Sequence, residues 1–366
     1  IGVGVMPTPA LAWLAARRGV PAAMITASHN PWQDNGVKFF APGGLKLLDE
    51  VERAIEAVLQ LEGPEPHDVV PSHVDALGEY VAHLVSLGGS LVGLRVVLDC
   101  ANGAMSVAAP AVFRALGATV VVVHDRPDGR NINDRCGATH TASLAAAVVA
   151  EGAHLGLAFD GDGDRVIAID ELGNAVDGDR LIALAALQLR DEGRLHADTV
   201  VVTVMSNLGF HKAMVAAGIE VLTTAVGDRY VLEALDAHGH SVGGEQSGHI
   251  IYRDVATTGD GLLAGLRLAQ FVHDGGHALA ELAGGVMTSY PQVLVNVRVR
   301  ERHPRVAAEL SAEIEAAERS LGGDGRILVR ASGTEPLIRV MVEAATEQQA
   351  QAVADELAAV VLGRFG

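Results

Sequence analysis

Residues 95–123, RVVLDCANGAMSVAAPAVFRALGATVVVV, indicate the fold class. An apolar, β-branched run from Arg95 to Asp99 leads through Asn102-Gly103 into a helical stretch that ends near Leu116-Gly117. A run of valines, Val120 to Val123, follows. Continuous β-branched runs separated by a helix are typical of buried parallel strands joined by right-handed crossovers. The stretch therefore predicts one unit of an α/β domain.

The same order of elements occurs before and after this stretch. Residues 1–6 have the composition of a strand, Thr8-Pro9 supplies an N-cap hydroxyl and a helix-starting proline, and Gly19 can end that helix before a strand at residues 22–26. A third copy comprises a strand, a helix and a strand, at residues 198–204, 207–218 and 219–224. Three such units, spaced about a hundred residues apart, indicate three related α/β domains.

The last part of the chain has a different pattern. It predicts strands at residues 293–299, 327–331 and 337–344, and helices at residues 304–320 and 346–362. This order is typical of an α+β domain with an antiparallel sheet. The predicted fold class is α/β, with three similar mixed-sheet α/β domains plus a smaller C-terminal α+β domain. The predicted domains are residues 1–88, 89–176, 177–289 and 290–366.

Composition excludes several classes of protein. The chain has 366 residues, 49% of them hydrophobic, which is enough for several cores. A formal net charge of -18 argues against nucleic acid and anionic membrane as partners, since both need a basic surface. Two cysteines cannot form a disulfide framework, and their spacing is not that of a structural zinc site. The sequence contains no long apolar run typical of a membrane span, so we expect a cytoplasmic protein.

Three aspartates alternate with glycines in residues 159–165, FDGDGDR. In an extended or looped backbone this spacing turns Asp160, Asp162 and Asp164 to one side, where their oxygens can surround a divalent cation. A calcium loop would need glycine where Arg165 stands, and residues 166–169 are typical of a strand. A solvated turn between two strands remains an alternative. We favour a magnesium site completed by phosphate.

The segment from Thr26 to Phe40, TASHNPWQDNGVKFF, could supply that phosphate. Ser28 ends an apolar run and precedes a turn signal, so its hydroxyl is expected to be presented to solvent; alone, this pattern favours simple turn chemistry. If phosphorylated, Ser28 would place its phosphoryl group beside the cation, where it is open to attack. Lys38, one of only three lysines, follows a short loop and could handle a proton or an oxyanion; a solvated surface lysine is the alternative.

Three further loops carry candidate binding groups. Residues 330–336, RASGTEP, and Arg339 combine hydroxyls, a glycine and two arginines, which suits a phosphate, although an ordinary hairpin would look similar. Residues 243–249, GGEQSGH, offer a carboxylate, an amide and a hydroxyl for a sugar ring. Residues 226–230, VGDRY, resemble an acidic helix start. Each of the last two could also be only a connecting loop.

Together these motifs resemble the α-D-phosphohexomutases over the whole chain. Residues 26–31 resemble the phosphoserine loop of that family, and residues 160–165, 244–249 and 330–336 resemble its metal, sugar and phosphate loops, in the family's order. The resemblance implies three similar α/β domains and a smaller fourth. It also implies a further N-terminal segment with a Gly-Thr-x-Gly-x-Arg-Gly loop, which has no counterpart here, so the first domain is expected to be N-terminally incomplete.

The resemblance assigns expected roles to individual residues. The expected catalytic residues are Ser28, His29, Lys38 and Arg165. The expected metal ligands are Ser28, Asp160, Asp162 and Asp164. The expected sugar-binding residues are Gly227, Asp228, Glu245, Ser247 and His249. The expected phosphate-binding residues are Arg330, Ser332, Gly333, Thr334 and Arg339. The implied cofactors are Mg2+ and a hexose or hexosamine 1,6-bisphosphate as activator.

The implied activity is a mutase cycle on a hexosamine phosphate. Phosphorylated Ser28 would give its phosphoryl group to the sugar 6-phosphate, and the other phosphate of the resulting 1,6-bisphosphate would return to Ser28. Gln246 after Glu245 favours the amino-sugar branch, which interconverts glucosamine 6-phosphate and glucosamine 1-phosphate. Mannose or glucose phosphates are the nearest alternative, and a catalytically silent sugar-phosphate-binding protein is the alternative of another class. A homodimer is a further expectation.

Overall fold

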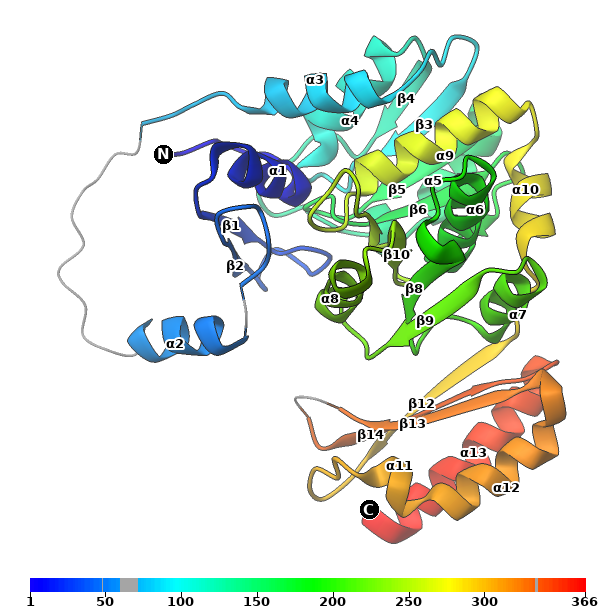
Figure 1. The fold of residues 1–366 in the computed structure, drawn as a ribbon. Helices are drawn as coiled ribbons and strands as arrows, with labels where there is room; N and C mark the ends of the chain where they lie inside the picture. The colour runs from blue at the N-terminus through cyan, green and yellow to red at the C-terminus, as the bar shows by residue number, and fades with distance from the viewer. Residues whose placement is uncertain (48, 60–71, 333–334) are drawn as a thin grey trace. The chain divides into compact units, whose positions relative to one another are not determined.

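The computed structural model describes residues 1–47, 49–59, 72–332 and 335–366 (Figure 1). The chain divides into two compact units, one formed by Ile1–Met205 with Met214–Val286 and the other by Ser206–Ala213 with Met287–Gly366. Among the described residues, no helix combines the length and hydropathy needed to cross a lipid bilayer.

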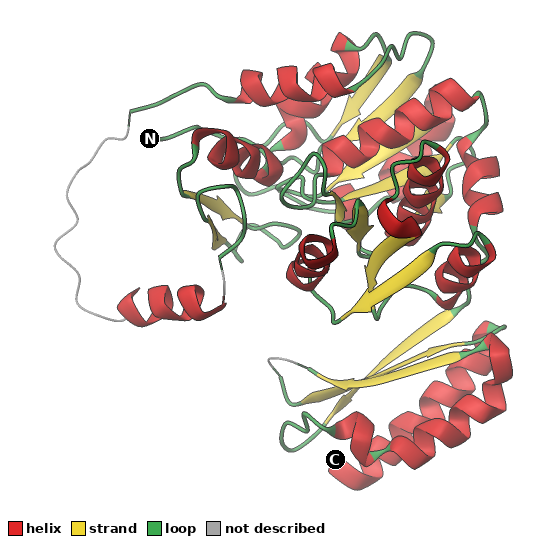
Figure 2. Cartoon of the chain, viewed as in Figure 1, coloured by secondary structure: helices red, strands yellow, loops and turns green. Residues whose placement is uncertain are grey.

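The first unit alternates helices with strands (Figure 2). Its helices are α1 (Thr8–Arg18), α2 (Asp49–Leu59), α3 (Leu77–Leu87), α4 (Met105–Ala115), α5 (Ala142–Glu151), α6 (Gly178–Asp191), α8 (Asp228–His238), α9 (Gly261–Gly275) and α10 (Leu279–Val286), with α7 (Leu208–Ala216) shared between the units. Its strands are β1 (Ala22–Thr26), β2 (Gly36–Phe40), β3 (Arg95–Asp99), β4 (Thr119–Val123), β5 (Leu155–Phe159), β6 (Val166–Asp170), β7 (Ala175–Val176), β8 (Thr199–Thr203), β9 (Glu220–Thr224), β10 (Val242–Gly244) and β11 (Ile250–Tyr252).

A five-stranded mixed sheet forms the centre of the first unit, in the order β4-β3-β5-β6-β7. Strands β4, β3 and β5 are parallel, whereas β6 and β7 run antiparallel to their neighbours. Ala158 belongs to a buried cluster with residues of α5, while the next residue back, Leu157, faces Gly265 of α9. Because neighbouring strand residues point to opposite faces, helices cover both sides of the sheet.

A four-stranded mixed sheet, β11-β10-β8-β9, follows, with β8 parallel to both of its neighbours. These two mixed sheets agree with the predicted buried parallel strands. The second unit contains the antiparallel sheet β12-β14-β13, as predicted, with helices packed on it. Its elements are β12 (Gln292–Arg298), α11 (Val306–Glu309), α12 (Ser311–Leu321), β13 (Arg326–Ala331), β14 (Leu337–Glu343) and α13 (Glu347–Phe365). The single helix predicted at 304–320 is wrong, because the buried Leu310 has a non-helical backbone.

One local expectation in the N-terminal part is also wrong. Residues 1–6 make no strand; Gly2 forms only an isolated bridge with His73, and two glycines leave little side chain to pack there. Lys38, expected to follow a short loop, lies on a strand. That strand, β2, pairs antiparallel with β1 and sets Lys38 opposite Met24. The segment that carries Ser28 therefore connects two paired strands.

Candidate active site

Ser28 lies two residues after the end of β1 in a left-handed backbone conformation, with φ of 53°. Its backbone N–H donates to Thr26 Oγ1 at 2.8 Å, and its Oγ lies 3.4 Å from His29 Nδ1. A left-handed conformation is unfavourable for a residue with a side chain and persists where the surroundings enforce it. The side chain is half-buried, so Ser28 is held in place while it remains accessible.

Asp160, Asp162 and Asp164 follow β5 and are buried, with exposed fractions of 0%, 2% and 4%. One ligand oxygen from each lies within 4.8 Å of the others. Three buried oxygens, Asp160 Oδ2, Asp162 Oδ1 and Asp164 Oδ1, accept no hydrogen bond from any described residue. Asp164 Oδ1 makes only longer ion pairs, with His249 Nδ1 at 3.7 Å and Arg165 Nε at 3.8 Å. Buried carboxylate oxygens without hydrogen bonds are costly, and a hard divalent cation is a partner that suits them. The residues present therefore fit a metal ion.

The pKa values within this cluster reflect the same crowding. Burial, together with the neighbouring Asp164 and Asp162, raises the pKa of Asp160 well above its usual value. Burial would also raise the pKa of Asp164, but His249 and Lys38 outweigh it and hold that pKa well below its usual value. Negative charge is therefore concentrated in the loop and only partly compensated by the protein.

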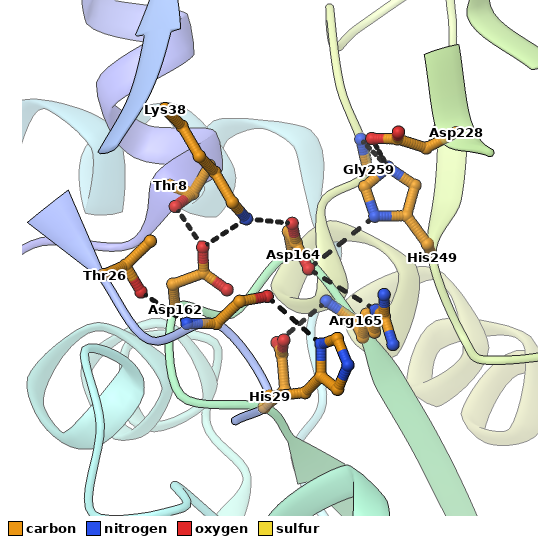
Figure 3. Close-up of polar contacts among 12 residues, drawn as sticks. Thr8, Thr26, His29, Lys38, Asp162, Asp164, Arg165, Asp228, His249 and Gly259 are labelled. Carbon is orange, nitrogen blue, oxygen red and sulfur yellow. Dashed lines mark hydrogen bonds and ion pairs between the residues drawn. The ribbon is translucent and has the colours of Figure 1, made fainter. Parts of the chain in front are cut away.

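Lys38 and Thr8 bind one oxygen of Asp162, and Lys38 also binds one oxygen of Asp164 (Figure 3). Lys38 Nζ donates to Asp162 Oδ2 at 2.7 Å and to Asp164 Oδ2 at 2.9 Å. Burial would lower the pKa of Lys38, but Asp164 and Asp162 together raise it above its usual value. Thr8 Oγ1 donates to Asp162 Oδ2 at 2.5 Å. Thr8 is thus not the N-cap expected from the sequence: Pro7 occupies that position, and the hydroxyl makes a stronger, charge-assisted bond instead.

The phosphoserine-type loop packs directly on the aspartate loop. A Cβ atom placed on Gly161 would lie 2.5 Å from the backbone oxygen of Ser28, so only glycine allows this approach. Arg165 follows the three aspartates; its backbone N–H donates to Asp160 Oδ1 at 3.1 Å, and burial, then the charge of Arg165, lowers the pKa of His29. The structure therefore brings Ser28, His29, Lys38 and Arg165 to one place beside the aspartates.

His249 connects the aspartate loop to the segments expected to bind sugar. Its Nδ1 lies 3.7 Å from Asp164 Oδ1, its Nε2 lies 3.3 Å from Asp228 Oδ2, and Gly259 N–H donates to Nε2 at 3.0 Å (Figure 3). Asp228 begins α8 and also pairs with Lys46. Burial would raise the pKa of Asp228, but His249 and Lys46 lower it.

The remaining sugar-loop residues lie close to that position. Glu245 Oε1 accepts a hydrogen bond from Gly227 N–H at 3.1 Å, which ties the two predicted loops together. Ser247 is exposed and Glu245 is half-buried, so both are accessible to a ligand. The predicted sugar-binding residues thus form one group within the first unit.

The predicted phosphate-binding residues belong to the second unit. Arg330 and Arg339 are directly opposite each other on β13 and β14, where two like charges are unfavourable unless an anion joins them. Burial, then the charge of Arg339, lowers the pKa of Arg330. Arg339 Nε is buried without a hydrogen-bond partner among the described residues, and Ser332 is buried nearby in sequence. Gly333 and Thr334 lie outside the described residues.

Sequence reasoning did not predict a site role for three residues that contact predicted site residues of the first unit: Thr8 contacts Asp162, Lys46 contacts Asp228, and Asn133 contacts Ser28. Asn133 donates to the backbone oxygens of Ser28 and Asn30. Lysine is so rare in this chain that Lys46 could have been noticed beside Lys38. Nothing local distinguishes Thr8 or Asn133, because their partners are more than a hundred residues away.

Family models cover nearly the whole chain. The models of the phosphoglucomutase/phosphomannomutase α/β/α domains I, II and III match residues 1–64, 71–173 and 177–290, and the model of the C-terminal domain matches residues 294–360. The order of four domains confirms the predicted fold class.

Relatives and solved structures agree with these matches. Phosphoglucosamine mutase of Rhodococcus jostii is 53% identical over 99% of this chain and 83% of the relative, and that of Frankia casuarinae is 55% identical over 98% and 80%. A Burkholderia thailandensis phosphoglucomutase/phosphomannomutase family protein has the same fold, with a TM-score of 0.80 at 23% identity over 99% of this chain and 82% of that protein. Aspergillus fumigatus N-acetylphosphoglucosamine mutase, solved with GlcNAc-6P and magnesium, has a TM-score of 0.74 at 21% identity over 98% and 93%. The resemblance seen in the sequence is therefore confirmed, and the chain belongs to the phosphoglucomutase/phosphomannomutase family of α-D-phosphohexomutases.

Proposed function

We propose that this protein is a mutase that interconverts glucosamine 6-phosphate and glucosamine 1-phosphate through a phosphoserine at Ser28 and a 1,6-bisphosphate. One observation carries the proposal: the loop of Ser28 packs against an aspartate loop in which three buried carboxylate oxygens accept no hydrogen bond from the described residues. Relatives more than 50% identical bear the name phosphoglucosamine mutase, which supports the choice of an amino sugar. We propose a cytoplasmic location, and a homodimer remains a prediction.

The chemical step at Ser28 is a phosphoryl transfer in which one phosphate ester, at Ser28, is exchanged for another, on the sugar. A hydroxyl oxygen of the sugar phosphate forms a bond to phosphorus as the bond between phosphorus and Ser28 Oγ breaks. The attacking hydroxyl gives up its proton to a base on its own side of phosphorus, and the leaving Ser28 Oγ takes up a proton, which His29 Nδ1 at 3.4 Å is placed to supply. In the return step Ser28 Oγ gives up its proton and bonds to the phosphorus at the other end of the sugar, and the sugar oxygen that leaves takes up a proton.

Asp160, Asp162 and Asp164 would hold Mg2+, with the Ser28 phosphate as a further ligand. When bound, the ion neutralises charge on the phosphoryl oxygens and so favours attack at phosphorus. Lys38 fixes Asp162 Oδ2 and Asp164 Oδ2, so the oxygens that accept no hydrogen bond would be the ones available to the ion. Arg165 adds positive charge where the transferred group carries negative charge.

Binding of the substrate would divide between two groups of residues. Glu245 and Ser247 offer acceptors and donors to the sugar hydroxyls, while Gly227 and Asp228 shape the adjoining helix start. His249, expected to bind sugar, is buried with its ring nitrogens directed to Asp164, Asp228 and Gly259, so it would act by holding the sugar loop in place. The paired arginines Arg330 and Arg339, with Ser332, Gly333 and Thr334, would bind the phosphate that is not being transferred. A bisphosphate activator would supply the first phosphoryl group to Ser28.

The first experiment tests phosphorylation of Ser28. Wild type and Ser28→Ala are incubated with glucose 1,6-bisphosphate and Mg2+, and their intact masses are compared. Only wild type is expected to gain one phosphoryl group. Wild-type protein without that gain, or an equal gain in Ser28→Ala, would contradict the assignment.

The second experiment tests the substrate. Turnover of glucosamine, glucose and mannose phosphates is compared under identical conditions, with the bisphosphate present at trace concentration. We expect the highest kcat/KM for the glucosamine phosphate. A clear preference for glucose or mannose phosphate would select the alternative activity, which the family name also allows. Binding of all three without any turnover would select the silent sugar-phosphate-binding protein.

A further inference from the structure

Asn133, between β4 and α5, reaches across to the loop that carries Ser28. Its Nδ2 donates to the backbone oxygen of Ser28 and to that of Asn30, each at 2.8 Å. A side-chain amide nitrogen has two hydrogens to donate, and here both are used on one loop. Asn133 is 8% exposed, so water competes little for these two hydrogen bonds.

The surroundings of Asn133 hold an unusual concentration of unfavourable backbone conformations. Among the described residues, eight that are not glycine have positive φ, and six of them lie in this assembly: Ser28, Ala101, Asn102, His124, Asn133 and Arg135. Such conformations cost free energy and persist where the surrounding structure enforces them, often at functional sites. The strained segments belong to the Ser28 loop and to three loops beside it.

Asp99 fixes these loops to the end of β3. It is fully buried and accepts hydrogen bonds from Ala101 N–H at 2.9 Å and from Gly137 N–H at 3.0 Å. His124 Nδ1 lies 3.1 Å from Asp99 Oδ2. The backbone N–H of Asn133 in turn donates to Ala101 O at 2.9 Å. Asn133 is thus connected through Ala101 and Asp99 to the end of β3.

We propose that Asn133 is a positioning residue that sets the backbone of the Ser28 loop and thereby the direction in which Ser28 Oγ is presented. The inference rests on the proposed phosphoryl transfer at Ser28. Asn133 contacts the two carbonyls and not the reacting oxygen, so it acts through the loop. Transfer needs near in-line geometry, and a misplacement of about 1 Å can cost about 100-fold in rate.

Two substitutions at position 133 test the side-chain amide while the left-handed backbone conformation can be kept. Asn133→Gly removes both hydrogen bonds while allowing the left-handed φ without strain. Asn133→Asp keeps the size of the side chain but replaces the two donors with an acceptor that repels the carbonyls. We expect kcat to fall about 10- to 100-fold in both variants, with little change in KM for the sugar phosphate. Faster amide hydrogen exchange is expected in residues 26–36.

Asn102→Gly is the matched control. Asn102 is also left-handed and belongs to the same assembly, but its amide nitrogen points to Asn131 O and Cys136 Sγ rather than to the Ser28 loop. This variant shares any general loosening of the assembly. We expect it to keep the wild-type kcat and wild-type exchange in residues 26–36.

The outcomes distinguish this inference from the proposed function. If wild type shows no mutase turnover and no phosphorylation of Ser28, the proposed function fails, and exchange in residues 26–36 still decides whether Asn133 orders the loop. Unchanged exchange and unchanged kcat in Asn133→Gly would overturn the inference. An equal loss of kcat in Asn102→Gly, or a loss of stability in Asn133→Gly with wild-type kcat, would show a structural role only and would overturn it as well.

Discussion

The contact between Gly161 and the Ser28 loop allows the proposed geometry to be perturbed by a single methyl group. In Gly161→Ala, the new Cβ would meet the backbone oxygen of Ser28 at 2.5 Å and the side chain of Ile132 at 2.6 Å. Ile132 can move because it is a side chain, but Ser28 O belongs to the main chain. The substitution therefore displaces the loop that carries the nucleophile, while the three aspartate side chains are retained.

The structure sets the size of the expected effect. Reaching an ordinary contact of 3.4 Å requires a movement of about 0.9 Å between Gly161 and Ser28. A displacement of that order costs about 100-fold in a reaction that depends on alignment, equivalent to about 2.7 kcal/mol of activation free energy. Stability should fall by about 1 to 3 kcal/mol, as for other overpacked sites. We expect the Mg2+ concentration for half-maximal activity to change much less than kcat.

The assay is steady-state turnover of glucosamine phosphate as a function of Mg2+, with thermal unfolding in parallel. Gly156→Ala is the matched control, since its Cβ would meet Val148 at 2.5 Å in the core of the same unit, away from Ser28. It should lose comparable stability and retain kcat. A kcat in Gly161→Ala that equals that of Gly156→Ala would refute the reasoning, because the clash would then not reach Ser28.

Three other substitutions test charges in the two units. Lys38→Met removes two hydrogen bonds to Asp162 and Asp164, and we expect kcat to fall about 10- to 150-fold, since a charged hydrogen bond is worth about 1.5 to 3 kcal/mol. Arg330→Ala should raise KM for the sugar phosphate over a similar range of about 10- to 150-fold and change kcat less. Burial raises the pKa of Asp260 from 3.8 to about 6. The protonated carboxyl therefore contributes to the free energy of unfolding fully below pH 3.8, and this contribution is lost as the pH rises through 6. Asp260→Asn should therefore gain up to about 3 kcal/mol relative to wild type as unfolding is measured from low to neutral pH.

Each of these predictions has its own control and contrary result. Lys212→Met removes an exposed lysine that pairs with Asp324, and it should leave kcat unchanged; a loss equal to that of Lys38→Met would remove Lys38 from the site. Arg319→Ala, on an exposed face of α12, should leave KM unchanged, and the same KM in Arg330→Ala would exclude Arg330 from phosphate binding. A stability difference between Asp260→Asn and wild type that stays constant with pH would show that Asp260 has an ordinary pKa.

Local patterns determined much of the fold. The strand, helix and strand at residues 95–123 were predictable because hydrophobic period and glycine placement reflect backbone geometry within a few residues. The spacing of Asp160, Asp162 and Asp164 predicted clustered carboxylates for the same reason. The N-cap predicted from local pattern at Thr8 was wrong. Its hydroxyl could cap its own helix, but it donates to the buried Asp162, which is distant in sequence and which no local pattern reveals.

The sequence by itself thus determined the family, the order of α/β units and the groups available for metal, sugar and phosphate. Only the tertiary structure decided which of them meet. Thr8 reaches Asp162 across 154 positions of sequence, Lys46 reaches Asp228 across 182, and Asn133 reaches Ser28 across 105. Such contacts depend on how whole sheets and helices pack, whereas spacing along one segment encodes only what its own backbone can bring together.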